Sequence, residues 1–243
     1  MIKIYADGAS DTGMLELTNF PVIKGFTTNP TLMRQAGITK YDGFIRTVIP
    51  DLKKYRPDTN ISLEVISDNW LDMSRQAHVL HSFSKEYDYP IYIKIPVMTT
   101  NGKPTYDLVK GLHDEGMLIN ITAVFTEVQG YNVLNALRNN DKTPSIISIF
   151  AGRIADTQVD PEPTVKEIVR YRSEFGLAGP QILWASTREI FNIVQAEYCG
   201  CDIITVTHEQ LKKLSLEHKD LTEYSRETVQ MFYNDAVASG FTL

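Results

Sequence analysis

The chain has 243 residues, a net charge of −6 and a hydrophobic fraction of 43%. That length is typical of one α/β barrel, and the hydrophobic fraction is enough for a sizeable core. The acidic balance and the scattered basic residues argue against nucleic acid as a partner, because phosphate backbones attract clustered lysine and arginine. We find no run of about 18 apolar residues that predicts a membrane helix and no signal-peptide pattern, so we expect no membrane partner and a cytoplasmic location.

Short β-rich runs alternate with amphipathic stretches along the chain. The runs that predict strands are Ile2–Asp7, Val22–Thr28, Ile61–Ile66, Ile91–Val97, Leu118–Phe125, Ser145–Ala151, Gln181–Ser186 and Asp202–Thr207. The stretches that predict helices are a short one near Thr12–Leu17, then Tyr41–Tyr55, Trp70–Glu86, Tyr106–Glu115, Glu127–Leu137, Thr164–Phe175, Arg188–Tyr198 and His208–Leu216. Such alternation predicts the α/β class, with a parallel sheet covered by helices, and its simplest closed form is a (β/α)8 TIM barrel. An open doubly wound sheet is the alternative, but Asp7–Ser10 lacks the glycine-rich loop that usually follows its first strand.

An additional C-terminal helix, Leu221–Ala238, follows the last strand–helix unit. We expect a single domain over 1–243, with the barrel over about 1–218 and the helical extension over about 219–243. The apolar residues of this helix, such as Phe232 and Val237, suit packing on its own barrel or on a neighbouring subunit. Both arrangements stay open, and the second underlies our expectation of a homo-oligomer.

Alternation within the strands places polar side chains inside the predicted barrel. In Ile91–Val97, the Ile and Val side chains share the outer face, whereas Tyr92, Lys94 and Pro96 face inward. The same alternation directs other side chains inward, namely Asp7, Ser62, Glu64, Asn120, Thr122, Val124, Ser148 and Phe150, while Asn29 continues the face of Ile23, Gly25 and Thr27. An interior lysine is costly unless it is paired or neutralised, so a catalytic task for Lys94 is the natural hypothesis.

An interior lysine near carboxylates predicts one of two reaction classes. Lys94 can form an imine with a ketone or aldehyde, or it can remove a proton as a neutral amine, a form that desolvation favours. An imine also acts as an electron sink, so a neighbouring carbon–carbon bond can break or form. Asp7 and Glu64 are then candidates for moving protons, and Thr122 is a candidate for holding a water. A non-catalytic sugar-phosphate-binding barrel is a further alternative, but it gives Lys94 no task.

Two arginines follow predicted strand ends. Arg153 comes directly after Gly152, and Arg188 follows Ser186 at the start of a predicted helix. Guanidinium groups, a hydroxyl and free helix N–H groups together predict a phosphate site.

Neither the histidines nor the cysteines predict a metal site. None of the five histidines falls on a predicted strand, and we expect them on helix surfaces. Cys199 and Cys201 are the only two cysteines, and their spacing suits free buried thiols better than a disulfide or a zinc site.

Several of these segments resemble the transaldolase family. Thr27–Thr31 resembles its TTNPS signature after the second strand, and Ile93–Val97 resembles its Schiff-base lysine strand. Asn120–Phe125 resembles its fifth strand, whereas Gly152–Asp156 and Ala185–Arg188 resemble its two phosphate-binding segments. The matches fall in order over nearly the whole chain, which makes the resemblance specific.

The similar fructose-6-phosphate aldolases tend to carry Gln where this chain has Glu64 and Tyr where it has Phe150. The resemblance therefore favours transfer of a dihydroxyacetone unit between sugar phosphates, with simple aldol cleavage as the alternative. It leaves open whether the substrates belong to the pentose phosphate pathway or to a specialised sugar pathway.

The resemblance also implies a role for each candidate residue. Lys94 forms a Schiff base with the donor ketone, Asp7 takes the proton of the substrate hydroxyl, and Glu64 and Thr122 manage a water. The residues implied to contact the sugar phosphate are Thr28, Asn29, Asn120, Ser148, Phe150, Arg153, Ser186 and Arg188. No metal and no organic cofactor is implied.

Overall fold

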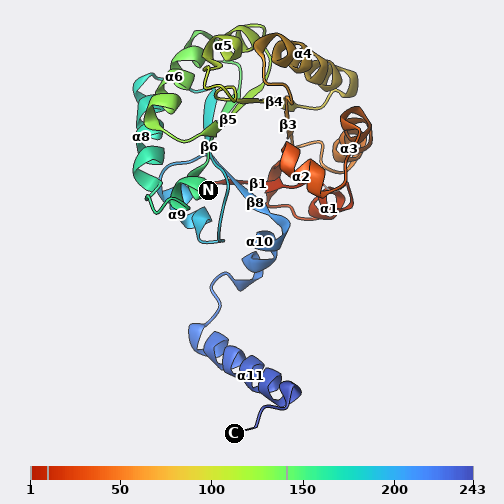
Figure 1. The fold of residues 1–243 in the computed structure, drawn as a ribbon, viewed down its shortest axis with the longest axis vertical. Helices are drawn as coiled ribbons and strands as arrows, with labels where there is room; N and C mark the ends of the chain where they lie inside the picture. The colour runs from red at the N-terminus through yellow and green to blue at the C-terminus, as the bar shows by residue number, and fades with distance from the viewer. Residues whose placement is uncertain (1, 10, 141, 243) are drawn as a thin grey trace.

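The computed structural model describes residues 2–9, 11–140 and 142–242. Its strands pair in parallel and in chain order, from β1 round to β8 and back to β1, as a closed barrel (Figure 1). The strands are β1 Lys3–Asp7, β2 Ile23–Thr27, β3 Ile61–Glu64, β4 Ile91–Pro96, β5 Ile119–Val124, β6 Ser145–Ile149, β7 Pro180–Trp184 and β8 Ile203–Thr207. The fold is the predicted (β/α)8 TIM barrel.

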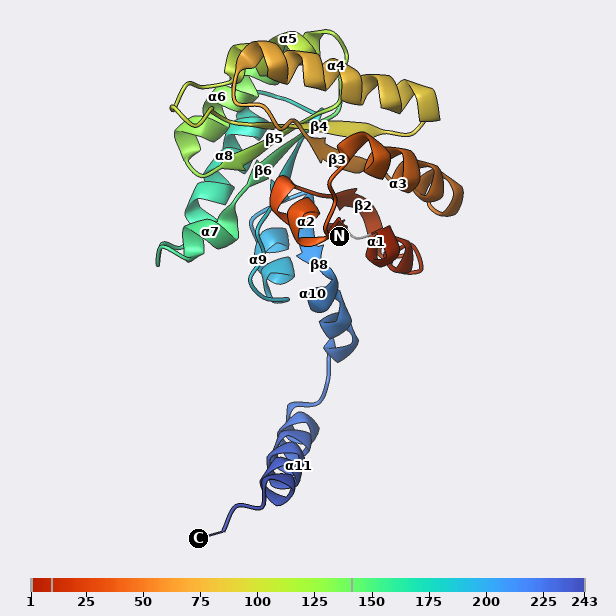
Figure 2. The same ribbon diagram turned by 45° about the vertical axis from the view of Figure 1, so that its right-hand side comes forward.

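Helices form the outer layer around the barrel, and a last helix stands away from it (Figures 1 and 2). They are α1 Asp11–Leu17, α2 Pro30–Gln35, α3 Tyr41–Tyr55, α4 Trp70–Tyr87, α5 Tyr106–Asp114, α6 Glu127–Leu137, α7 Ala151–Ala155, α8 Glu162–Glu174, α9 Asn192–Tyr198, α10 His208–Lys212 and α11 Leu221–Ser239, with short 3₁₀ turns at Arg138–Asn140 and Lys213–Leu216. The bounds of α3 and α6 agree with the prediction. By contrast, α9 begins four residues later than predicted, because the Asn192 side chain accepts hydrogen bonds from the backbone N–H groups of Arg188 and Glu189 and fixes a turn there.

Side-chain caps begin several of these helices. The Asn69 side chain accepts from the backbone N–H of Asp72 at the start of α4. Thr126 and Thr207 form capping boxes at the starts of α6 and α10. Such caps satisfy backbone donors that a first helical turn leaves unpaired, so they fix where each strand-to-helix loop ends.

Two apolar layers hold the barrel together. The larger one lies between the sheet and the helices and contains most of the buried Ile, Leu and Val side chains. The smaller one fills the barrel interior, where Tyr5, Tyr92 and Leu183 pack together. Tyr5 faces Gly25, and a Cβ atom at residue 25 would come within 2.5 Å of the Tyr5 ring. Gly25 is thus required for the tyrosine that plugs the interior.

Two predicted inward side chains face outward instead. Val124 packs in the outer layer, because the β5–β6 register shifts between Ile121 and Val124, where Ala123 has a φ of +59°. Ile23 also packs in the outer layer, because the β1–β2 register shifts between Ile4 and Tyr5. Each irregularity reverses the alternation on which the prediction rests.

One histidine contradicts the expectation of helix-surface positions. His113 in α5 is fully buried, and its Nε2 lies 3.0 Å from the carbonyl oxygen of Thr143. The cysteines agree with the prediction, since Cys199 and Cys201 are both buried and free.

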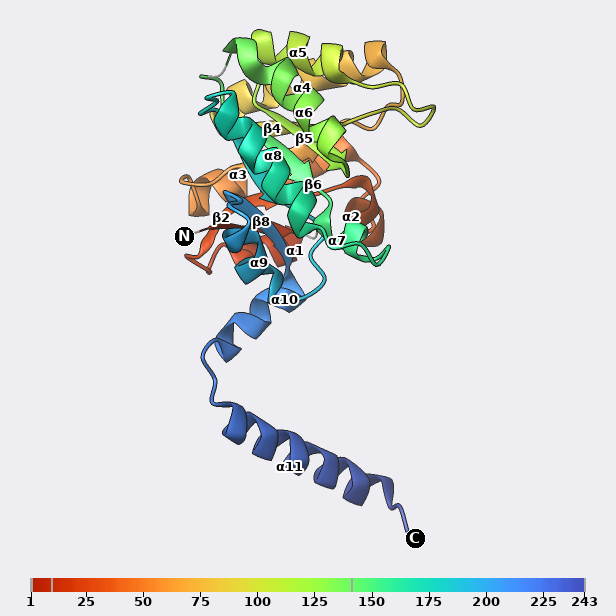
Figure 3. The ribbon, with the colours of Figure 1, turned by 90° about the vertical axis from the view of Figure 1, so that its left-hand side faces the viewer.

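The last helix, α11, stands away from the barrel in all three ribbon views, and the C-terminus lies at its far end (Figure 3). Its apolar side chains are exposed, among them Leu221 at 79% and Phe232 at 62%. Packing on its own barrel, one of the two arrangements left open by the sequence, is therefore not what the structure has. No helix in the described part of the chain is long and apolar enough to cross a membrane.

Candidate active site

A cavity of about 270 Å³ lies where the carboxyl ends of the strands meet. In a (β/α)8 barrel this is the end that carries the catalytic residues. The predicted site residues that line it are Asp7, Asn29, Lys94, Thr122, Ser148, Phe150, Arg153, Ser186 and Arg188. Glu64, Thr28 and Asn120 are not among the lining residues but contact those that are.

Lys94 is the buried cation of the cavity, with 6% of its surface exposed. It lies in register with Glu64 on β3 and Asn120 on β5, so these three side chains project at the same level of the barrel. Its Nζ donates to the carbonyl oxygen of Thr28 at 2.8 Å and lies 3.1 Å from Oε2 of Glu64. The amine is therefore held from two sides while it faces the cavity.

Asp7 is the second ionisable group that reaches the cavity from inside the barrel. It is the last residue of β1, and its Oδ1 accepts a hydrogen bond from the Thr27 hydroxyl at 2.7 Å. Burial raises the pKa of the Asp7 carboxyl, an effect that nearby Lys94 and the Thr27 hydrogen bond oppose. A carboxyl group with a raised pKa is a candidate for proton transfer.

Hydroxyl and amide groups complete the deep wall of the cavity. The Asn120 amide donates to Oγ of Ser62 at 3.0 Å and accepts from the Ser148 hydroxyl at 2.7 Å. Asn120 is fully buried behind Ser148, so the cavity is lined by Ser148 and not by the amide. The Thr122 hydroxyl is buried, lines the cavity and has no hydrogen-bond partner among the described residues. It can therefore pair with a bound molecule.

The two arginines lie at the rim of the cavity in different states. Arg188 donates from Nε to Asp156 at 2.8 Å, forms a second bond to the same carboxylate through Nη2, and donates from Nη1 to the Ser186 carbonyl at 3.0 Å. Arg153 lies over the Phe150 ring, 5.2 Å from its centroid, and no carboxylate in the described part of the chain forms an ion pair with it. Arg153 is thus the guanidinium with the more available charge.

Sequence reasoning missed one wall of the cavity. Thr31, Leu32 and Gln35 contribute to it from α2, a six-residue helix absent from the prediction. A signal for α2 does exist in the sequence, since Asn29 caps the helix through a bond from the Leu32 N–H and Pro30 takes its first position. Asp156, which binds Arg188, was also not predicted as a site residue.

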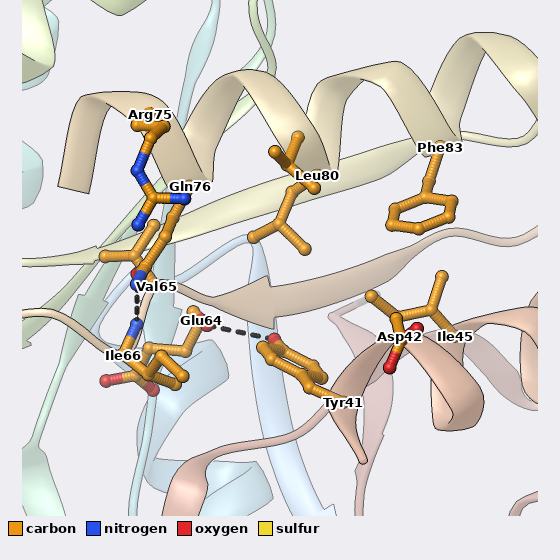
Figure 4. A pocket seen from close by; sticks show the side chains of 11 residues that line it. Tyr41, Asp42, Ile45, Glu64, Val65, Ile66, Arg75, Gln76, Leu80 and Phe83 are labelled. Carbon is orange, nitrogen blue, oxygen red and sulfur yellow. Dashed lines mark hydrogen bonds between the residues drawn. The ribbon is translucent and has the colours of Figure 1, made fainter. Parts of the chain in front are cut away.

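A second cavity, of about 190 Å³, lies between α3 and α4 on the outer side of β3 (Figure 4). Apolar side chains such as Ile45, Leu80 and Phe83 form its walls. Asp42, Glu64 and Arg75 also line it, but neither Lys94 nor Asp7 does. In the described part of the chain, no cluster of three or more His, Cys, Asp or Glu side chains could hold a metal ion.

A closed barrel whose lysine, carboxyl groups and arginines gather around one cavity at the carboxyl ends of its strands has the layout of a (β/α)8-barrel enzyme. Comparison with known proteins gives the family. The profile of the family described as "Transaldolase/Fructose-6-phosphate aldolase" matches residues 4–243. The chain belongs to this family and is an enzyme of the aldolase or transaldolase type.

Similar proteins carry a name from the same family. A "Probable transaldolase" of Kosmotoga olearia is 30% identical over 234 residues, which cover 96% of this chain and 95% of that protein. Proteins of the same name from Thermoanaerobacter sp. and Dehalococcoides mccartyi are 30% identical over 215 residues and 27% identical over 213 residues. Both alignments cover 88% of this chain, with 89% of the Thermoanaerobacter protein and 90% of the Dehalococcoides protein.

Proposed function

We propose that this protein is a transaldolase, which transfers a dihydroxyacetone unit from a ketose phosphate, such as fructose 6-phosphate or sedoheptulose 7-phosphate, to an aldose phosphate. The observation that carries the proposal is the buried Lys94 amine, which faces the cavity while Glu64 and the Thr28 carbonyl hold it. A lysine desolvated in this way is suited to attack a carbonyl carbon as a nucleophile.

The first half of the reaction is an imine-assisted cleavage. Lys94 Nζ attacks the ketone carbon of the donor, water leaves, and a Schiff base forms. Asp7 then takes the proton of the hydroxyl on the far carbon of the bond that breaks, this carbon becomes the aldehyde of the departing aldose phosphate, and the bond electrons move into the imine. The three-carbon enamine stays on Lys94 until its carbon attacks the acceptor aldehyde and the steps reverse. No metal or organic cofactor takes part.

The surrounding groups support these steps. Glu64 and Thr122 relay protons through a water during imine formation and hydrolysis. Asn29 and Ser148 bind the ketol hydroxyls, with Asn120 behind Ser148, while Arg153, Ser186 and Arg188 bind the phosphate group. Asp7 must be ionised to accept a proton, and burial raises its pKa. The rate should therefore rise with pH through a value above the ordinary aspartate pKa of about 3.9.

Borohydride trapping tests the covalent step. The protein is incubated with fructose 6-phosphate and borohydride, and the modified peptide is mapped by mass spectrometry. We expect one three-carbon or sugar-phosphate adduct on Lys94, and Lys94→Arg as a matched control should carry none. An unmodified Lys94 in an enzyme that still turns over would contradict the Schiff base and favour an isomerase that uses Lys94 as a base.

Transfer is distinguished from simple cleavage by the fate of the enamine. Protonation of the enamine carbon would release free dihydroxyacetone, and a phenol at residue 150 could supply that proton. Phe150 has no acidic proton to give. The centroid of its ring lies 5.7 Å from that of Phe125. Phe150→Tyr and Glu64→Gln should each raise dihydroxyacetone release relative to transfer, measured with and without erythrose 4-phosphate. Fast release by the unmodified enzyme regardless of acceptor would favour a fructose-6-phosphate aldolase.

The exposed face of α11 suits a homo-oligomer. Phe232, Tyr233 and Val237 are each more than 60% exposed on a helix that stands off the barrel. A second copy that packs on this helix would remove that apolar surface from water. Light scattering of the full chain should give a mass above one subunit, and Phe232→Glu should lower it.

Buried free thiols fit a reducing cytoplasm.

A further inference from the structure

The backbone carbonyl of Glu64 lacks its ordinary strand partner. Along the β2–β3 ladder, Phe26 N–H donates to Asn60 and Thr28 N–H donates to Ser62, at 2.8 and 3.3 Å. These hydrogen bonds recur at every second residue of both strands. The next one would run from the N–H of residue 30 to the carbonyl of Glu64. Residue 30 is Pro30, which has no N–H and already begins α2, so the ladder cannot supply this bond. The carbonyl that ends β3 therefore needs a donor from elsewhere.

Tyr41 supplies that donor. Its hydroxyl donates to the Glu64 carbonyl oxygen at 2.9 Å, from the first turn of α3 (Figure 4). The tyrosine ring lines the largely apolar cavity between α3 and α4, where a partly buried carbonyl without a partner would be costly. The Tyr41 hydroxyl therefore replaces the backbone N–H that would otherwise donate to this carbonyl.

The opposite edge of the same strand is held by β4. The N–H of Val65 donates to the carbonyl of Lys94 at 3.0 Å. Beyond it, Oε1 of Gln76 accepts from the N–H groups of Ile66 and Ser67 at 2.8 and 3.1 Å, so α4 fixes the chain as it leaves the sheet (Figure 4). Glu64 thus ends a four-residue strand whose end is held by hydrogen bonds on both sides, and Tyr41 provides the hydrogen bond on the α3 side.

We propose that Tyr41 is a positioning residue for the reaction: its hydroxyl fixes the end of β3 so that the Glu64 carboxylate stays against Lys94. This inference rests on the proposed function, because it assigns Glu64 a part in the chemistry at Lys94. The Tyr41 hydroxyl bonds to the backbone of Glu64, and Tyr41 does not line the cavity that holds Lys94, so it acts through Glu64 and not on the substrate.

Tyr41→Phe tests this role, since it removes the hydroxyl and keeps the ring in the cavity wall. We expect kcat for transfer to fall about three- to tenfold, the range that corresponds to one net hydrogen bond, with little change in KM. Tyr106→Phe is the matched control, because Tyr106 also begins a helix and its hydroxyl has no hydrogen bond among the described residues. It should leave kcat unchanged.

A double-mutant cycle with Glu64→Gln separates positioning from a general loss of stability. If Tyr41 acts through Glu64, Tyr41→Phe should have little further effect on kcat or on borohydride trapping once Glu64 is replaced. Equal losses in both backgrounds, or an unchanged kcat in the single variant, would overturn the proposal. Failure of the unmodified enzyme to trap substrate on Lys94 would instead count against the proposed function. Circular dichroism and Tm identify any variant that misfolds.

Discussion

Gly152 is the contact point between helix α7 and the loop after β7, the two segments that carry the candidate phosphate residues. It precedes Arg153 in α7 and lies against Ser186 in the loop, where its N–H donates to the Ala185 carbonyl at 3.3 Å. A Cβ atom at residue 152 would lie 1.6 Å from the Ser186 carbonyl oxygen. Ser186 has a φ of +66°, so its backbone already occupies a region that non-glycine residues rarely adopt.

Gly152→Ala should therefore separate α7 from the loop that carries Ser186. Real Cβ contacts essentially never fall below 3.0 Å, so the two segments must move apart by about 1.4 Å before alanine fits. A misplacement of about 1 Å can cost on the order of 100-fold in rate when several groups bind one substrate. We expect kcat/KM for fructose 6-phosphate to fall by about that factor, mainly through KM, because Arg153 and Arg188 no longer meet the same phosphate.

The assay is steady-state kinetics together with competitive inhibition by inorganic phosphate, which reports the phosphate site alone. The inhibition constant for phosphate should rise in Gly152→Ala. Gly111→Ala is the matched control, because Gly111 lies within α5, a Cβ atom there meets nothing within 4 Å, and alanine is the better helix former. Gly152→Ala with unchanged KM and unchanged phosphate inhibition would refute this account of the loop contact.

Two further predictions follow from charge and burial. Arg153→Ala and Arg188→Ala should each raise KM for phosphorylated donors by about tenfold or more, because each removes a charge-assisted hydrogen bond. Arg226→Ala on α11 is the control and should leave KM unchanged. Unchanged kinetics in both site variants would place the phosphate group elsewhere. Burial lowers the pKa of His113, so the unfolded chain binds more protons than the folded one as pH falls below about 6.5. Urea denaturation should therefore show stability present above that pH and lost below it, with a weaker loss in His113→Gln, and an equal slope in both proteins would contradict the assignment.

Much of the interior could be predicted from strand alternation. In a regularly paired sheet, residues in register on neighbouring strands point to the same face. Glu64 and Asn120 are in register with Lys94, so all three side chains point into the barrel. The prediction is wrong where the ladder is irregular. The left-handed residue Ala123 turns Val124 outward, and neither composition nor hydrophobicity marks that residue as a bulge.

The short helices α2 and α7 could not be predicted from periodicity. Helices of six and five residues complete barely more than one turn, so they present no repeating apolar face. Their positions nevertheless decide the cavity wall, since α2 contributes Leu32 and α7 contributes Arg153. Ion pairs across loops, such as that of Arg188 with Asp156, depend on loop geometry and likewise escape a reading of local sequence.

Burial divides the candidate site into residues that can touch a substrate and residues that hold them. Thr28 is fully buried and offers its carbonyl to Lys94, while Asn120 is fully buried between Ser62 and Ser148. Neither lines the cavity, so each can act only through its neighbour. Pro30 is exposed but also acts through a neighbour, because its missing N–H leaves the Glu64 carbonyl to Tyr41. The segment Thr27–Thr31 therefore combines cavity-facing side chains with residues whose backbone chemistry sets the position of Lys94 and its carboxylate partner.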